Sequence, residues 1–402
     1  MMPLKKNTSF FISPLVLSLY FLLPVLALFS CRNGSSNSKK DPNSPVTKIS
    51  LPAPGEISES EKQELFHACQ LWYDSMLKPA VFNGGMVVAV KGNIIFEKYK
   101  GSNPLGGPDS VDSNTSFHIA SVSKTFTAMC VLKLWQDSLV DIDAEYSHYF
   151  PSFNYPGVTI RTLLNHRSGL PNYLYFMEKL GYKDSPAISN QQVLDNLVAH
   201  KSTLENIGTP NKNFSYCNTN YALLALLIEK ISGQTYPQFV KQHIFDPLGM
   251  QHSFVFTPAD SNRITPNYDW KGGRNADNFL DHVYGDKNIY STPRDLLTWD
   301  RALSSNLLFT KETLQQAYTP YSNERPGIKN YGLGWRMNIY PNGKKVIFHN
   351  GWWHGNNAAF IRLMDEDATI IVLGNRYCRN IYRAYQLVNS FSKYFEVLEV
   401  EE

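Results

Sequence analysis

Segments that favour β-strands lie near both ends of this chain, and segments that favour helices lie between them. Near the start, residues 85–90 and 94–96 are apolar and flank Lys91-Gly92-Asn93, which predicts a β-hairpin. Four further strand-like segments occur near the end, at residues 331–335, 345–348, 358–362 and 369–373. Because strands pair to bury their apolar faces, we predict one antiparallel sheet built from both chain ends and flanked by helices. The expected class is an α/β (α+β) fold with an inserted all-helical lobe.

Helical periodicity begins at Ser58, where Ser58 and Glu61 form a capping-box signal ahead of apolar residues at helical spacing. Further helices are expected over residues 123–139, near 160–166, 190–200, 218–232, 236–244 and 293–303, and over 381–395. We therefore expect one domain at residues 58–402. Its α/β lobe would take in about 58–120 and 290–402, and its helical lobe about 121–289.

The first thirty residues have the organisation of an export signal. Two lysines precede an uncharged apolar stretch at residues 10–29. An uncleaved membrane helix is the alternative, because about 20 residues would just span a bilayer, but two prolines interrupt the stretch. Its end, Ser30-Cys31, resembles the lipobox of bacterial lipoproteins. The resemblance implies a signal peptide at residues 1–30, a lipid on Cys31, and anchoring to a membrane of the cell envelope, in the periplasm or at the outer surface.

Residues 31–57 are rich in Ser, Asn, Pro and Gly, and we expect them to form a flexible tether. Across the whole chain, 38 Lys and Arg against 35 Asp and Glu give a net charge of +3, which provides no electrostatic reason to expect a nucleic-acid partner. Five cysteines in 402 residues do not make a small disulfide scaffold. The sequence leaves open the oligomeric state and the disulfide status of Cys69, Cys130, Cys217 and Cys378.

The pattern S-x-x-K occurs four times, starting at Ser36, Ser75, Ser121 and Ser390, so position must distinguish the copies. Only Ser121 opens a long apolar helix. There Ser121 and Lys124 lie one turn apart on the same face, and the positive helix N-terminus disfavours an ammonium ion. A neutral amine beside a hydroxyl is an activated nucleophile. The alternative is that Ser121 caps the helix and Lys124 is solvated.

Two other short patterns carry chemistry. Tyr216-Cys217-Asn218 ends a loop that feeds an apolar helix, so the phenol can relay a proton and the amide can bind substrate. A core tyrosine and a helix-capping asparagine are the alternatives. His349-Asn350-Gly351-Trp352 follows a strand signal, where Gly351 permits close backbone approach of a ligand and His349 can carry a proton near neutrality. A surface histidine at a strand end is the alternative.

Ser121-x-x-Lys124, Tyr216-x-Asn218 and His349-x-Gly351, in this order, resemble the active-site elements of class C β-lactamases and related serine hydrolases. That group includes D-Ala-D-Ala carboxypeptidases, D-aminopeptidases, family VIII esterases and other penicillin-binding-protein-like enzymes. Residues 162–171, 290–296 and 331–335 resemble supporting segments of the same family, and the similarity covers roughly residues 60–395. The resemblance implies a β-lactamase/transpeptidase-like fold.

The resemblance also implies roles for single residues. Ser121 would attack an amide or ester carbonyl, and Lys124 and Tyr216 would share the general-base and general-acid work. The substrate-binding residues would be Asn218, His349, Asn350 and Gly351, and the backbone N–H groups of Ser121 and Trp352 would form the oxyanion hole. No metal or cofactor is needed.

The implied function is a serine hydrolase that acts through an acyl-enzyme, on a D-amino-acid peptide or a small ester. Class C β-lactamases carry Lys-Thr-Gly where this chain has His349-Asn350-Gly351, and this departure disfavours an efficient β-lactamase. A true β-lactamase and a non-catalytic penicillin- or ligand-binding lipoprotein remain the alternatives.

Overall fold

The computed structural model describes residues 47–102 and 110–395. Its contacts divide the chain into Met1–Pro45 and Val46–Glu402, and all described residues belong to the second unit. The expected signal peptide and Cys31 lie outside the described residues. Within the described ranges, no helix combines the length and the apolar character needed to cross a bilayer. Cys69, Cys130, Cys217 and Cys378 are buried free thiols.

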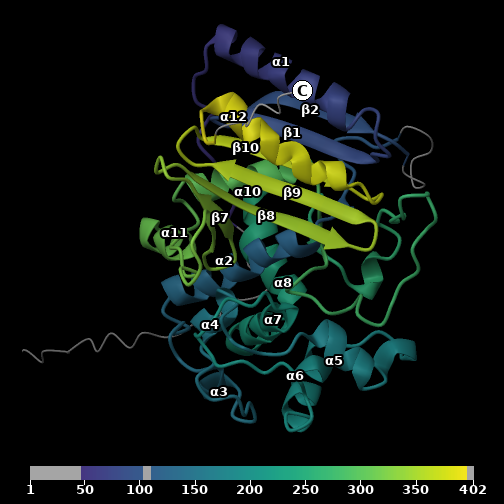
Figure 1. The fold of residues 1–402 in the computed structure, drawn as a ribbon, viewed down its shortest axis with the longest axis vertical. Coiled ribbons are helices and arrows are strands. Elements are labelled where there is room, and N and C mark those ends of the chain that lie inside the picture. Colours follow the sequence, from purple (N-terminus) through teal and green to yellow (C-terminus); the bar gives the residue numbers. More distant parts are fainter. Residues whose placement is uncertain (1–46, 103–109, 396–402) are drawn as a thin grey trace, which may run out of the picture. The chain divides into compact units, whose positions relative to one another are not determined.

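The central feature is a seven-stranded antiparallel sheet in the order β2-β1-β10-β9-β8-β7-β6 (Figure 1). Its strands are β1 Gly84–Val90, β2 Asn93–Lys100, β6 Lys329–Tyr331, β7 Arg336–Ile339, β8 Lys345–Trp353, β9 Asn356–Leu363 and β10 Ala368–Gly374. The N-terminal hairpin joins the C-terminal strands where β1 pairs with β10, with Val87 opposite Ile371. The prediction of one sheet built from both chain ends is confirmed.

Both faces of the sheet are buried. Neighbouring strand residues point to opposite faces, and on β1 each of two neighbours lies in a different core. Val88 packs into the core beneath α1 (Glu59–Met76), the 3₁₀ turns at Arg379–Leu387 and α12 (Val388–Phe391). Its neighbour Val87 packs into the larger core on the helical side. Figure 1 shows α1 and α12 side by side, although they come from opposite ends of the chain.

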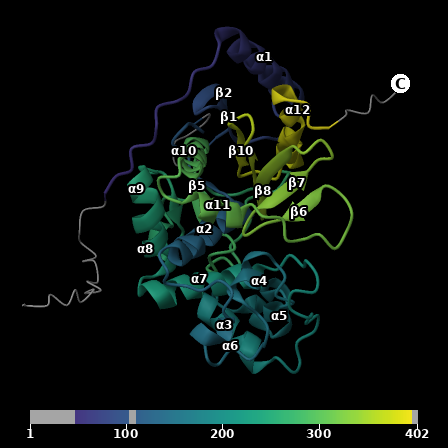
Figure 2. The ribbon, with the colours of Figure 1, turned by 90° about the vertical axis from the view of Figure 1, so that its left-hand side faces the viewer.

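Helices from the middle of the chain form the second part of the molecule (Figure 2). They are α2 Ser123–Gln136, α3 Tyr146–Tyr149, α4 Ile160–Leu164, α5 Tyr173–Lys179, α6 Asn190–Ala199, α7 Asn218–Ser232, α8 Tyr236–Val240 and α9 Asp246–Leu248. Two later helices lie closer to the large sheet: α10 (Pro293–Ser304) packs against β1 and β10, and α11 (Lys311–Ala317) packs against α2. A small three-stranded sheet joins β3 (Phe117–His118), β5 (Ile289–Ser291) and β4 (Phe254–Val255) in that order. This sheet was not predicted, because its strands are only two or three residues long.

Three local predictions were wrong. The expected strand at 331–335 is mostly the turn between β6 and β7, and the expected helix at 381–395 is largely 3₁₀. Residues 47–57 do not hang free as a tether. They lie along the domain because Ile49 and Leu51 pack against its core and the Ile49 N–H donates to the Pro247 oxygen at 2.8 Å.

At the start of α1, the structure shows one of the two bonds of the predicted capping box. Ser58 caps the helix, and its hydroxyl accepts from the Glu61 N–H at 3.2 Å.

Candidate active site

The predicted nucleophile lies in a strained turn. Ser121 belongs to the single 3₁₀ turn Ala120–Val122 that leads into α2, and Ala120 has a φ of +49°. A non-glycine residue in this left-handed region costs about 1–3 kcal/mol and persists only where its surroundings hold it. Such turns occur at functional sites, so the strain agrees with a working position for Ser121.

Lys124 is joined to this serine and is not solvated. Its Nζ lies 3.0 Å from Ser121 Oγ and donates to the backbone oxygen of Asp286 at 2.7 Å. The lysine side chain is fully buried, at 0% exposed. Ser121 makes no capping bond with the helix start. One of the two other described S-x-x-K copies, at Ser75, differs, since its Lys78 pairs with Asp74 on the surface.

Tyr216 is brought to the same place by the loop that precedes α7. Lys124 Nζ lies 5.1 Å from the Tyr216 ring centroid, and the centroid of the His166 ring lies 4.3 Å from it. His166 also holds the loop, because its Nδ1 accepts from the Cys217 N–H at 3.1 Å. Tyr216 therefore lies beside Lys124, and among the described residues its hydroxyl makes no hydrogen bond to Lys124 or Ser121.

The remaining residues of the Y-x-N pattern occupy the start of α7. Asn218 is half-buried and is the first residue of the helix, so the helix-capping position falls on Cys217 and not on Asn218. The Cys217 thiol donates to the Leu170 oxygen at 3.3 Å, and burial raises its pKa. A buried, protonated thiol acts here as packing.

The strand β8 runs past the nucleophile turn at Gly351. A Cβ at this position would lie 2.3 Å from the Ile119 oxygen and 3.1 Å from the Ser121 nitrogen. We expected Gly351 to permit close approach of a ligand. In the structure it permits close approach of the chain's own nucleophile turn. Pairing between β7 and β8 stops at Arg336 and Phe348, so the part of β8 at Asn350 and Trp352 is an open edge beside Ser121.

His349 is not the proton carrier that the sequence suggested. It is fully buried, its Nδ1 contacts the Asn350 oxygen at 2.8 Å, and its Nε2 lies 3.3 Å from the Tyr331 hydroxyl. Burial, together with the positive charges of Arg336 and Lys124, lowers the pKa of His349 well below its usual value. The imidazole is neutral at pH 7, so we assign it to holding the strand and Tyr331.

Sequence reasoning missed Arg336 on β7. Its guanidinium carbon lies 4.8 Å from the Tyr216 ring centroid and 6.0 Å from that of Tyr331. Within the described ranges no carboxylate pairs with this half-buried cation. The available signal was its place directly after Trp335, in a segment that resembles the family. Only its contacts with Tyr216 and Tyr331 in the structure show that it faces the site.

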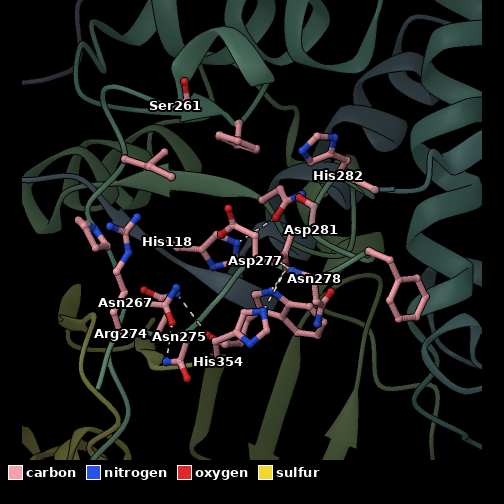
Figure 3. Close-up of a pocket in the computed structure, with 18 of the residues that line it drawn as sticks. His118, Ser261, Asn267, Arg274, Asn275, Asp277, Asn278, Asp281, His282 and His354 are labelled. Carbon is pink, nitrogen blue, oxygen red and sulfur yellow. Dashed lines mark hydrogen bonds and ion pairs between the residues drawn. The ribbon is translucent and has the colours of Figure 1, made fainter. Parts of the chain in front are cut away.

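Two cavities lie near these residues. Tyr216 and Cys217 line one of about 490 Å³, together with apolar residues of α5 and the loop near Leu204. A second cavity, of about 440 Å³, lies beyond the end of β8, where Trp353 and His354 form part of its wall (Figure 3). The first contains a member of the predicted catalytic set and is the better candidate for part of the substrate site. Tyr173 on α5 is fully buried.

Comparisons with known proteins agree with this architecture. The sequence profile of the family described as Beta-lactamase matches residues 75–386. Penicillin-binding protein 4* of Bacillus subtilis (strain 168) is 30% identical over 332 residues, which cover 78% of this chain and 73% of that protein.

Two solved structures show the same fold. A penicillin-binding protein from Bacillus halodurans has a TM-score of 0.67 at 23% identity and covers 81% of this chain and 98% of its own. A D-amino acid amidase from Ochrobactrum anthropi SV3, solved with D-phenylalanine, has a TM-score of 0.66 at 22% identity and covers 82% of this chain and 98% of its own.

The fold is β-lactamase/transpeptidase-like, and Ser121 is hydrogen-bonded to Lys124 in a family of serine-hydrolase type. The chain belongs to the beta-lactamase family.

Proposed function

We propose that this protein hydrolyses an amide or ester through an acyl-enzyme on Ser121. The observation that carries the proposal is the 3.0 Å contact between Lys124 Nζ and Ser121 Oγ in a site where the lysine is fully buried. The serine oxygen attacks the carbonyl carbon, and its proton passes to Lys124 or Tyr216. That proton then goes to the departing amine or alcohol, and water hydrolyses the acyl ester.

The oxyanion of the tetrahedral intermediate would be held by the backbone N–H groups of Ser121 and Trp352. The approach of Gly351 to the Ser121 nitrogen supports this assignment, because it brings the open edge of β8 next to the nucleophile. Removal of one such donor typically costs about 10²–10³ in rate. Asn218, at the start of α7, and Asn350 on β8 would bind substrate from either side.

Arg336 supports a more specific substrate. An arginine that has no carboxylate partner in the described residues and stacks on Tyr216 is suited to a substrate carboxylate close to the scissile bond. A peptide ending in a free D-amino acid has that carboxylate. The name of one structurally similar protein, a D-amino acid amidase, also refers to a D-amino acid. We therefore propose D-amino-acid peptides as substrates ahead of small esters, and ahead of β-lactams because His349-Asn350-Gly351 stands where class C β-lactamases carry Lys-Thr-Gly.

Adduct formation tests the proposal. The full chain is incubated with a fluorophosphonate and with a labelled penicillin, and the labelled peptide is located by mass spectrometry. We expect an adduct on Ser121 and none in Ser121→Ala. No adduct from either reagent in folded protein would point instead to a ligand-binding protein. Comparison of kcat/KM for D-alanyl peptides with and without a free carboxylate, for an ester and for a β-lactam then identifies the substrate class.

We also propose that the protein is an exported lipoprotein held to the cell envelope through Cys31. The apolar stretch that ends at Ser30-Cys31 supports this. The N-terminal peptide of protein recovered from membranes should begin at a lipid-modified Cys31, and Cys31→Ala should abolish that modification. A mature chain that begins elsewhere would refute the proposal.

A further inference from the structure

A histidine outside the predicted catalytic set bonds directly to the nucleophile turn. His118 lies on β3, three residues before Ser121, and is only 3% exposed. Its Nδ1 accepts from the Ala120 N–H at 3.1 Å. Ala120 is the residue with the left-handed φ of +49°. This one bond therefore acts on the backbone whose conformation presents Ser121.

The tautomer of His118 follows from its partners. Because Nδ1 accepts a hydrogen bond, the proton of the neutral ring is on Nε2. Nε2 lies 3.0 Å from Asn288 Oδ1 and donates to it. The orientation of the Asn288 amide is also determined, since its nitrogen donates to the backbone oxygens of Asp281 and Val283 at 2.6 and 3.0 Å. Each polar atom in this chain of bonds has the partner that it requires.

The chain of bonds reaches the end of β8, the oxyanion strand, which carries the Trp352 N–H. Asp281 Oδ1 accepts from Trp353 Nε1 at 2.8 Å and lies 3.2 Å from His354 Nε2. Trp353 directly follows Trp352, whose N–H we assign to the oxyanion hole. Figure 3 shows His118, Asp281 and His354 around the second cavity, each from a different segment. The same bonds thus connect the nucleophile turn with the strand that must face it.

We propose that His118 is a positioning residue for acylation, which holds the Ala120 turn in register with the oxyanion strand through Asn288 and Asp281. The inference rests on the proposed function, because it concerns the rate at which Ser121 is acylated. His118 acts through Ala120 and does not touch substrate. Burial lowers the pKa of His118 to about 4, so its Nδ1 remains an acceptor at neutral pH.

Three substitutions separate positioning from general stability. In His118→Asn, Oδ1 is the same number of bonds from Cα as Nδ1 and can still accept from Ala120. In His118→Gln, the amide is polar and of similar size but extends one bond further. His118→Leu has no acceptor. The assay is the acylation of Ser121 by a labelled penicillin, which resolves the limiting rate constant from the apparent dissociation constant, with Tm measured for each variant.

We expect His118→Leu and His118→Gln to lower the limiting rate constant by about 10²-fold, the usual effect of a misplacement near 1 Å. The apparent dissociation constant should change little, and His118→Asn, which keeps the acceptor for Ala120 but not the donor to Asn288, should recover part of the rate. Equal rates for the asparagine and glutamine variants at similar Tm would overturn the proposal. If wild-type protein forms no adduct, the proposed function fails instead, so the two failures are distinguishable.

A double-variant cycle keeps the test valid if His118→Leu folds poorly. Glycine adopts a positive φ without strain, so Ala120→Gly reduces the need for an external restraint. We expect the loss caused by His118→Leu to be smaller in the Ala120→Gly background than in the wild type. Losses that simply multiply in the double variant would show that His118 does not act through the turn.

Discussion

Gly351→Ala should uncouple the oxyanion strand from the nucleophile turn without removing a catalytic group. The new Cβ would lie 2.3 Å from the Ile119 oxygen, and real Cβ contacts are essentially never found below 3.0 Å. Because that oxygen belongs to backbone, the turn and β8 must separate by roughly 0.7 Å, close to the 1 Å misplacement that can cost about 10²-fold in rate. We therefore expect acylation of Ser121 to slow by about 10²-fold.

The assay is stopped-flow labelling of Ser121 with a fluorescent penicillin, with Tm measured in parallel. Overpacking in a well-packed site usually costs about 1–3 kcal/mol, so the variant should remain folded. Gly208→Ala is the matched control, since its Cβ would meet only ordinary contacts, the nearest at 3.4 Å. If Gly351→Ala is acylated as fast as Gly208→Ala, the contact between β8 and the turn does not set the geometry of the oxyanion hole.

Three further outcomes follow from the site. Lys124→Ala should reduce acylation by at least about 10²-fold, as expected for loss of a general base, and a wild-type rate would exclude lysine activation. Arg336→Met should raise KM for peptides with a free carboxylate but not for the matching amides. An equal rise for both would show that Arg336 does not bind the substrate carboxylate. The free energy of unfolding should fall as pH drops from about 6.5 to 4, by about 3 kcal/mol from His118 alone, because the unfolded chain takes up the proton first. Urea titrations of wild type and His118→Asn at pH 7 and 4.5 measure this, and equal pH dependence in both would contradict it.

Sequence patterns identified the candidate catalytic residues but not the distances between them in the fold. Ser121 and Lys124 could be paired from sequence because three residues along a helix fix their separation. Tyr216 could be assigned to the site only through the family resemblance, since its distance from Lys124 depends on how α7 packs against α2. The protonation of His349 was mispredicted for a related reason. Burial and the charge of Arg336 determine it, and neither is visible in the local sequence.

Besides those of Arg336 and His118, several contacts that sequence reasoning missed gather on one stretch, residues 285–289. The Asp286 oxygen accepts from Lys124, the Ile289 N–H donates to Ser123 Oγ at 3.1 Å, and Ile289 also accepts from the Ile119 N–H at 2.9 Å. Nothing in the composition of this stretch marks it as catalytic, because it acts mainly through backbone groups that every residue carries.

A side chain of the same stretch, residues 285–289, also supports the end of β8. Lys287 is buried, donates to the Tyr173 hydroxyl at 2.5 Å, and lies 4.7 Å from the Trp353 ring centroid. One segment therefore contacts the nucleophile turn, the lysine and the end of β8. Because a shift of that segment moves all three together, we infer that substitutions here alter the limiting rate of acylation more than substrate affinity, as a rigid support for preorganised groups requires.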